Sequence, residues 1–161
     1  MILNDSMYKI KEIYNKLNCN SSVETQSEGK KLARNITDLS LLIQPDDAMM
    51  AWKNCAVVLS EKSDGELAPY SEKLLEWLQD INWDGAQIIL NRLKHCYDER
   101  LAISLENAVA DAQKMPQEYG LMWLDYLSEL LDNTFIANKL SCKTAALLQE
   151  HYHNWTFWYE E

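Results

Sequence analysis

The sequence predicts an all-α protein, and three observations support this prediction. Its 161 residues include only four glycines and three prolines, too few for the many turns of an all-β sandwich. Apolar residues recur every three or four positions along most of the chain, which is the period of a helix with one buried face. Residues suited to helix N-caps stand at the breaks between these segments. We expect antiparallel helix pairs stacked as a short solenoid, with a compact helical bundle as the alternative.

The chain is expected to fold as a single helical domain, residues 1–161. One domain is usual at this length, and the chain is long enough to bury a sizeable core. Residues 1–45 form the N-terminal part of this domain and end at Pro45. Ser21 and Glu24 have the spacing of a capping box, which would open the second of two N-terminal helices. These helices are predicted over residues 3–18 and 22–37.

Three predicted helix pairs follow in residues 46–161, each about 30–35 residues long, which is the repeat length of helical-repeat proteins. Asp46 or Asp47 can cap the first of these helices, and residues 63–65 read as a turn before the next helix. Ser141 can cap the last helix. The pairs are predicted over residues 46–79, 84–114 and 119–152.

The last eleven residues crowd several aromatic side chains together. We expect this tail to fold back and cap the last helix pair, because the end of a solenoid must hide an otherwise open core. The alternative is an aromatic anchor for a partner protein. The aromatic residues concerned are Tyr152, Trp155, Phe157, Trp158 and Tyr159.

The stretch LLEWLQDINWDGAQIILNRL, residues 74–93, predicts a tight joint between two antiparallel helices. Asn82 is a suitable N-cap for the second helix, and Asp84 would lie in its first turn, where the helix dipole favours a negative charge. Trp83 stands at the corner, where we expect it to wedge the joint against the core rather than contact a ligand. The apolar stripe of the first helix, which should be buried, includes Trp77 and Leu78.

The run LLEWLQD followed by any residue and then NW resembles the signature of a family of bacterial helical domains of unknown function. It is also similar to the joints of HEAT-like repeats, so the resemblance implies a HEAT-like solenoid. Asp84 stands where that family has proline, and aspartate still suits a helix start. The resemblance covers residues 46–133, and HYHNWTFWYEE is similar to the family's C-terminus. Relatives lie beside polymorphic toxins, so the resemblance implies an immunity protein, and it carries over no catalytic residue.

The formal net charge of −10 is unevenly distributed along the chain. Residues 1–45 hold six basic and five acidic residues, whereas residues 46–161 hold nine basic and twenty acidic ones. A nucleic-acid-binding protein needs a basic face to neutralise phosphates, so this class is not expected. An acidic surface serves ordinary solubility or binds a basic protein partner, and the sequence leaves both open.

If the acidic surface binds a partner, the best candidates are carboxylates at or near the ends and joints of the predicted helices. Charges at these positions on successive helix pairs can align along one edge of a solenoid. The predicted partner-binding residues are Glu76, Asp80, Asp84, Asp98, Glu99, Asp125, Glu129 and Asp132.

Catalytic, cofactor and metal sites are not expected. His151 and His153 form an HxH pair, but residues at i and i+2 of a helix point to different faces and cannot readily share a metal. His95 and Cys96 are neighbours that diverge in the same way, so they do not form a nucleophile–base pair. No phosphate loop, GxSxG or HExxH motif is present. We therefore expect that the protein is not an enzyme.

The sequence shows no apolar run long enough for a membrane span and no apolar core of a signal peptide near its start. Its four cysteines are widely spaced, which favours reduced thiols in the cytoplasm over disulfides. We therefore expect a cytoplasmic, non-catalytic protein-binding protein. The sharpest hypothesis is an immunity protein that neutralises a cognate toxin, such as a basic nuclease of the contact-dependent growth inhibition type. The alternative is a general helical adaptor with another protein partner.

Overall fold

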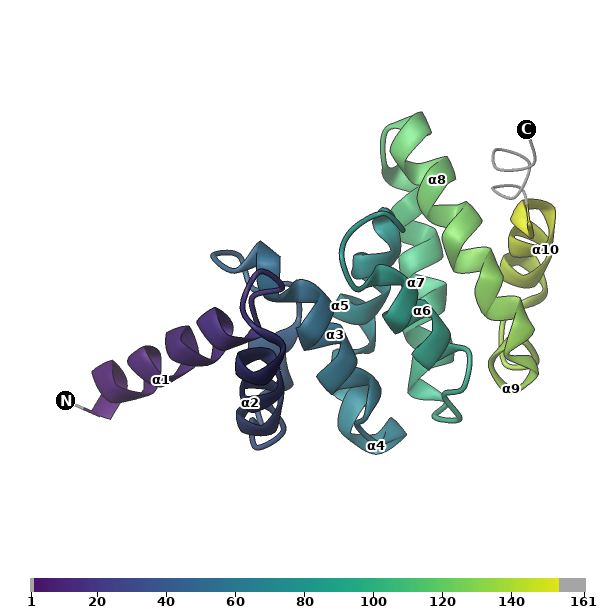
Figure 1. Ribbon diagram of the computed structural model, residues 1–161. Helices are drawn as coiled ribbons and strands as arrows, with labels where there is room; N and C mark the ends of the chain where they lie inside the picture. Colours follow the sequence, from purple (N-terminus) through teal and green to yellow (C-terminus); the bar gives the residue numbers. More distant parts are fainter. Residues whose placement is uncertain (1, 154–161) are drawn as a thin grey trace. The chain divides into compact units, whose positions relative to one another are not determined.

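The computed structural model describes residues 2–153, and all regular secondary structure in that range is helical (Figure 1). The all-α fold class is therefore confirmed for the described part of the chain. Stacking as a HEAT-like solenoid stays a prediction, as does the compact bundle. The predicted aromatic cap falls mainly on residues 154–161, outside the described residues. None of the described helices is both long enough and apolar enough to span a membrane.

The chain divides into two compact units, unit 1 (Met1–Lys62) and unit 2 (Ser63–Glu161). The division falls at the turn predicted over residues 63–65 rather than at Pro45, so the helix that follows Pro45 belongs to unit 1. Unit 1 contains α1 (Ile2–Leu17), α2 (Val23–Ala33), η1 (Leu39–Leu42), η2 (Met49–Ala51) and α3 (Trp52–Ser60), where η marks a 3-10 helix.

A buried asparagine ties the helices of unit 1 together. The Asn54 side-chain amide on α3 donates to the backbone carbonyl of Leu17 at 2.7 Å and to the side-chain carbonyl of Gln26 at 2.9 Å. Its acceptors lie at the end of α1 and within α2, so one side chain connects three helices. A buried polar group must be hydrogen-bonded to avoid a desolvation penalty, and this geometry meets that requirement.

The predicted N-cap of α2 is wrong. Ser22, not Ser21, is the N-cap, because the Ser22 hydroxyl accepts the Thr25 amide, while the Ser21 hydroxyl donates to the Asn15 carbonyl. Val23, the first residue of the helix, is 78% exposed. The helix instead packs through small residues, which let its backbone approach α1 closely. The buried residues of α2 are Gly29 and Ala33.

The predicted cap of the next helix is also wrong. Neither Asp46 nor Asp47 is an N-cap, because the segment begins with the 3-10 helix η2 and continues into α3. The Pro45 carbonyl accepts a hydrogen bond from the Trp52 indole N–H at 3.0 Å. The Trp52 indole therefore anchors the chain just before η2, where the sequence predicted an aspartate as the helix cap.

Unit 2 starts with a capping box where the sequence predicted a turn. The Ser63 hydroxyl accepts the Glu66 amide, and the Glu66 carboxylate accepts the Ser63 amide in return. The elements of unit 2 are α4 (Asp64–Leu67), η3 (Ala68–Tyr70), α5 (Ser71–Glu76), η4 (Trp77–Gln79), α6 (Ala86–Leu93), α7 (Arg100–Lys114), α8 (Gln117–Ser128), η5 (Glu129–Asp132), α9 (Thr134–Ala137) and α10 (Cys142–His151).

The core of unit 2 follows the predicted apolar stripes. Trp77 and Leu78 are fully buried, as predicted, and Ser141 caps α10 by accepting the Thr144 amide. Leu121 lies on the exposed side of α8. The largest fully buried side chains of unit 2 are Leu74, Leu75, Trp77, Leu78, Ile89, Leu93, Leu101, Leu105 and Leu127.

The hairpin between α7 and α8 depends on a glycine. A Cβ atom added at Gly120 would lie 2.2 Å from the backbone carbonyl oxygen of Ala112, a distance that no side chain can occupy. By contrast, a Cβ added at Gly65, in α4, meets nothing within 4 Å. Gly120 is therefore required for the close approach of the two helices, whereas Gly65 is not.

We predict opposite effects for the two matching substitutions. Gly120→Ala should lower the free energy of unfolding by roughly 1–3 kcal/mol, because overpacking displaces the backbone of α7. Gly65→Ala should leave it unchanged or raise it by up to about 1 kcal/mol, because alanine has less conformational freedom to lose in a helix. Chemical denaturation followed by circular dichroism measures both values. Equal effects of the two substitutions would contradict the close approach.

Candidate functional site

The predicted joint at residues 80–84 is compact, and a tryptophan closes it. The indole N–H of Trp77 donates to the backbone carbonyl of Asp84 at 3.1 Å. Within the joint, the Trp83 amide donates to the Asp80 carbonyl at 3.1 Å, and the Ala86 amide donates to the Trp83 carbonyl at 3.0 Å. The joint is therefore an ordered turn that begins at the end of η4 and leads into α6.

Two details of the predicted joint are wrong. The N-cap of α6 is Gly85, with a left-handed φ of 87° that suits glycine, and not Asn82. The backbone amide of Asn82 instead donates to the Asp80 carboxylate at 2.9 Å and closes a local turn. Asp84 therefore lies before the helix rather than in its first turn. Trp83 is 38% exposed, so Trp77, not Trp83, fills the corner against the core.

The C-terminal end of α6 leads into a second acidic loop. Asp98 accepts three hydrogen bonds from Arg100, at 3.0 Å from the backbone amide, 3.0 Å from Nε and 2.8 Å from Nη2. These bonds lower the pKa of Asp98 to about 2, so its carboxylate is charged at any physiological pH. The adjacent Tyr97 is 65% exposed and packs edge-to-face on Phe135, with ring centroids 5.9 Å apart.

We call the residues of these two loops the α6-end surface. It combines exposed aromatic rings with carboxylates, and the loops lie at opposite ends of α6 (Figure 1). Since α6 has eight residues, the two loops are separated by about 12 Å along the helix. The α6-end surface consists of Asp80, Trp83, Asp84, Tyr97, Asp98 and Glu99.

Three other carboxylates that were predicted to bind a partner contact residues of the same chain instead. Asp125, Glu129 and Asp132 have i, i+4, i+7 spacing on α8 and η5, so they lie on one helical face. Each contacts one of three successive residues at the end of α10. His151 Nδ1 lies 2.6 Å from Asp125 Oδ1, His153 Nδ1 lies 3.0 Å from Glu129 Oε1, and the Tyr152 hydroxyl donates to Asp132. We call this set, together with Lys94, the C-terminal clasp.

Lys94 completes the clasp from the end of α6. Its ammonium lies 3.0 Å from Asp132 Oδ2 and 3.5 Å from Glu129 Oε2, and Glu129 is only 3% exposed. Partial burial raises the pKa of Asp132, but hydrogen bonds from Tyr152 and Lys94 outweigh this effect, and the pKa lies below its ordinary value. The bond to Asp132 raises the pKa of Tyr152 to about 12. The clasp is therefore a charged network that fixes the end of α10.

The eight predicted partner-binding carboxylates thus fall into separate groups. Asp80, Asp84, Asp98 and Glu99 belong to the α6-end surface, and the clasp uses three others internally. Glu76 lies outside both groups and pairs with Lys73 on α5 at 3.2 Å. The sequence did not predict the clasp, although the acidic i, i+4, i+7 spacing and the HYH run were the available signals. The predicted partner-binding residues that belong to the clasp are Asp125, Glu129 and Asp132.

The histidines and cysteines highlighted in the sequence do not converge. His151 and His153 contact different carboxylates, and His95 Nδ1 lies 2.9 Å from the backbone carbonyl oxygen of Asn91 on α6. Burial raises the pKa of the Cys96 thiol, which disfavours the reactive thiolate. No group of three metal-ligating side chains occurs within residues 2–153.

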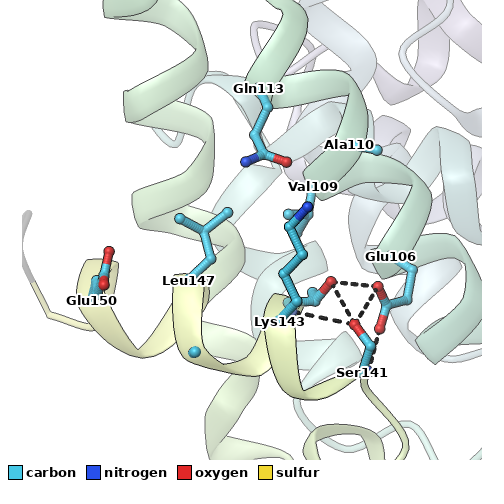
Figure 2. A pocket seen from close by; sticks show the side chains of 10 residues that line it. Glu106, Val109, Ala110, Gln113, Ser141, Lys143, Leu147 and Glu150 are labelled. Atoms are coloured by element: carbon cyan, nitrogen blue, oxygen red, sulfur yellow. Dashed lines mark hydrogen bonds between the residues drawn. The ribbon is translucent and has the colours of Figure 1, made fainter.

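A groove of about 500 Å³ lies between α7 and α10 (Figure 2). Figure 2 shows one of its two carboxylates, Glu106, directed at the start of α10. Glu106 accepts the Ser141 amide at 2.6 Å, the Ser141 hydroxyl at 3.2 Å and the Thr144 hydroxyl. Partial burial raises the pKa of Glu106, but these bonds outweigh it and lower the pKa overall. Because a general acid or base works best with a pKa near the operating pH, Glu106 is better suited to anchoring α10.

The family DUF5071, described as a domain of unknown function, matches residues 49–154. The match covers about two thirds of the chain, and the protein belongs to this family. The match includes both the α6-end surface and the clasp, whereas the sequence resemblance covered residues 46–133 and, separately, the C-terminal run HYHNWTFWYEE. No curated protein and no solved structure matches the chain.

We predict that the clasp stabilises the end of α10. Glu129→Gln should lower the free energy of unfolding by roughly 1–3 kcal/mol, because it removes the buried negative charge of Glu129, which contacts Lys94 and His153. Amide hydrogen exchange in residues 142–153 should become faster. Glu99→Gln, which changes an exposed glutamate in the same unit, serves as the control and should change neither quantity. Equal exchange rates in the two variants would refute the clasp.

Proposed function

We propose that this member of the DUF5071 family is a non-catalytic protein-binding protein whose acidic unit 2 binds a basic partner. The distribution of charge between the two units is the observation that carries the proposal. Unit 1 holds eight basic and eight acidic residues, so its formal charge is zero. Unit 2 holds seven basic and 17 acidic residues, a formal charge of −10. The whole net charge of the chain therefore resides in one unit.

Solubility alone does not require this separation of charge, since a charge spread over both units would serve equally well. A concentrated negative field attracts a cationic protein and raises its association rate. The α6-end surface supplies groups that binding interfaces favour, because Trp83 and Tyr97 are exposed aromatic side chains flanked by carboxylates. We therefore assign partner binding to this surface and exclude the clasp carboxylates, whose contacts hold the end of α10.

The finer proposal is an immunity protein that neutralises a cognate toxin, such as a basic nuclease, in the cytoplasm. Its support is the sequence resemblance to proteins found beside polymorphic toxins, together with the acidic unit 2. The free thiols of the described chain fit a reducing compartment, and burial raises the pKa of Cys55 to about 12. A helical adaptor with another basic partner would use the same surface. A toxin gene beside this gene, and rescue of cells from that toxin, distinguish the two functions.

Neutralising the α6-end surface should slow capture of the partner. We predict that a variant combining Asp80→Asn, Asp84→Asn, Asp98→Asn and Glu99→Gln binds the neighbouring toxin roughly tenfold more slowly at low ionic strength. The amides retain acceptor oxygens for the local turns, so helicity should stay unchanged. The salt dependence of the association rate should become flatter. Stopped-flow or surface-based kinetics at several salt concentrations measure these effects.

A charge-matched control separates this surface from overall charge. It neutralises four exposed carboxylates elsewhere and should keep most of the association rate. If the two variants slow association equally, the partner does not recognise the α6-end surface. If neither variant changes the rate or its salt dependence, the acidic mechanism is wrong. The control substitutions are Glu24→Gln, Asp46→Asn, Asp111→Asn and Glu118→Gln.

A further inference from the structure

Unit 1 carries a groove with exposed methionines on its walls, and the proposed function does not use it. The groove has a volume of about 600 Å³ and lies between α1 and residues 47–51. Met7 and Met49 on its walls are 56% and 61% exposed, and Met50 is 43% exposed. Methionine side chains are flexible and polarisable, so they adapt to an incoming apolar surface. Exposed apolar side chains gathered around one groove are typical of an interaction site.

Helix α1, which forms one side of the groove, also carries an apolar ridge. Met7, Ile10, Tyr14 and Leu17 follow the alternating spacing of three and four residues that pairs helices in coiled coils. Leu17 is fully buried inside unit 1, and the Tyr14 hydroxyl is held by the Leu41 carbonyl at 2.6 Å. Unit 1 therefore covers the C-terminal half of this stripe. At Met7 the stripe is open, and Figure 1 shows the N-terminal half of α1 extending past α2.

The groove requires an occupant with an apolar helical ridge, and α1 of a second molecule supplies one. A two-fold interface needs a surface that carries both the ridge and its matching groove. The N-terminal half of α1 meets this condition, because Met7 and Ile10 belong to the stripe and line the groove at the same time. Each copy would bury the exposed ridge of the other, so the N-terminal half of α1 would be shielded from water in both copies.

Charge favours a second copy over the basic partner at this surface. Unit 1 has a formal charge of zero, so its surface neither attracts a strongly charged protein nor repels its own copy. Two copies of unit 2, each with a formal charge of −10, would repel one another. Lys11 and Asp47, one on each side of the groove, carry opposite charges and leave it balanced.

We propose that the chain self-associates through unit 1, with the N-terminal half of α1 of each copy seated in the groove between α1 and residues 47–51 of the other. This interface is separate from the α6-end surface, so self-association and partner binding use different units. A dimer would present two acidic units to its partner.

The test measures the mass of the full chain by light scattering and sedimentation over a range of concentrations. The wild-type chain should be a dimer, and Met7→Lys or Met49→Lys should raise its dissociation constant at least tenfold. Val23→Lys is the matched control, because it adds the same charge to a residue of unit 1 that is 78% exposed and lies outside the groove. Circular dichroism checks that the three variants keep their helicity.

Methyl-labelled methionine gives a second readout that does not depend on substitution. In a mixture of labelled and unlabelled chains, intermolecular nuclear Overhauser effects should involve the methyl groups of Met7, Met49 and Met50. A monomeric wild type overturns the proposal, and so does a dimer that survives both groove variants. Methionine shifts that occur only on addition of the neighbouring toxin would assign the groove to that partner, which also overturns it.

Discussion

The hydrogen bond from the Trp77 indole to the Asp84 carbonyl is the constraint on which unit 2 depends. The Trp77 side chain is fully buried, and its N–H reaches across the joint to the residue just before the N-cap of α6. This bond satisfies a buried donor and at the same time fixes where η4 ends and α6 begins. A second indole acts in a related way, because Trp123 on α8 donates to the Leu75 carbonyl at 3.0 Å. The two tryptophans thus anchor α6 and α8 to the same short segment.

These constraints determine which carboxylates remain available. The closed joint directs Trp83 outward beside Asp80 and Asp84, while the clasp consumes the carboxylates of α8 and η5 to hold the end of α10. An acidic chain therefore uses its charges in two ways, as structural ties within unit 2 and as an exposed surface at the ends of α6. The separation follows from spacing, since a run of acids on one helical face is matched by three successive residues at the point where α10 ends and the backbone leaves the helix.

The positions of the helices could be predicted from sequence because periodicity is a local property. The helix pair predicted over residues 84–114 corresponds closely to α6 and α7, and Ser141 caps α10 as expected. The prediction of N-caps failed where several polar residues were adjacent, as at Ser21 and Ser22. Which of the two serines caps the helix depends on whether its hydroxyl is hydrogen-bonded elsewhere, as that of Ser21 is. The assignment of Trp83 to the core failed because both tryptophans border the joint and only packing decides which is buried.

The functional residues were predictable only in part. Acids at the predicted helix ends were visible in the sequence, and four of them form the α6-end surface with two aromatic residues. The clasp depends on contacts between residues 20 or more positions apart, which periodicity does not report. The groove on α1 was hidden for a related reason, because an amphipathic pattern does not show whether its apolar face is covered.

Trp77→Phe tests the central constraint most directly, because it keeps an apolar ring and removes the N–H. Unfolding free energy should fall by about 1–3 kcal/mol, since the Asp84 carbonyl and the joint lose their partner. Amide hydrogen exchange at Trp83 and Ala86 should become faster. Trp123→Phe, which removes the other indole bond, should destabilise unit 2 without this local effect. Unchanged exchange at both amides in Trp77→Phe would show that the joint does not depend on the indole bond.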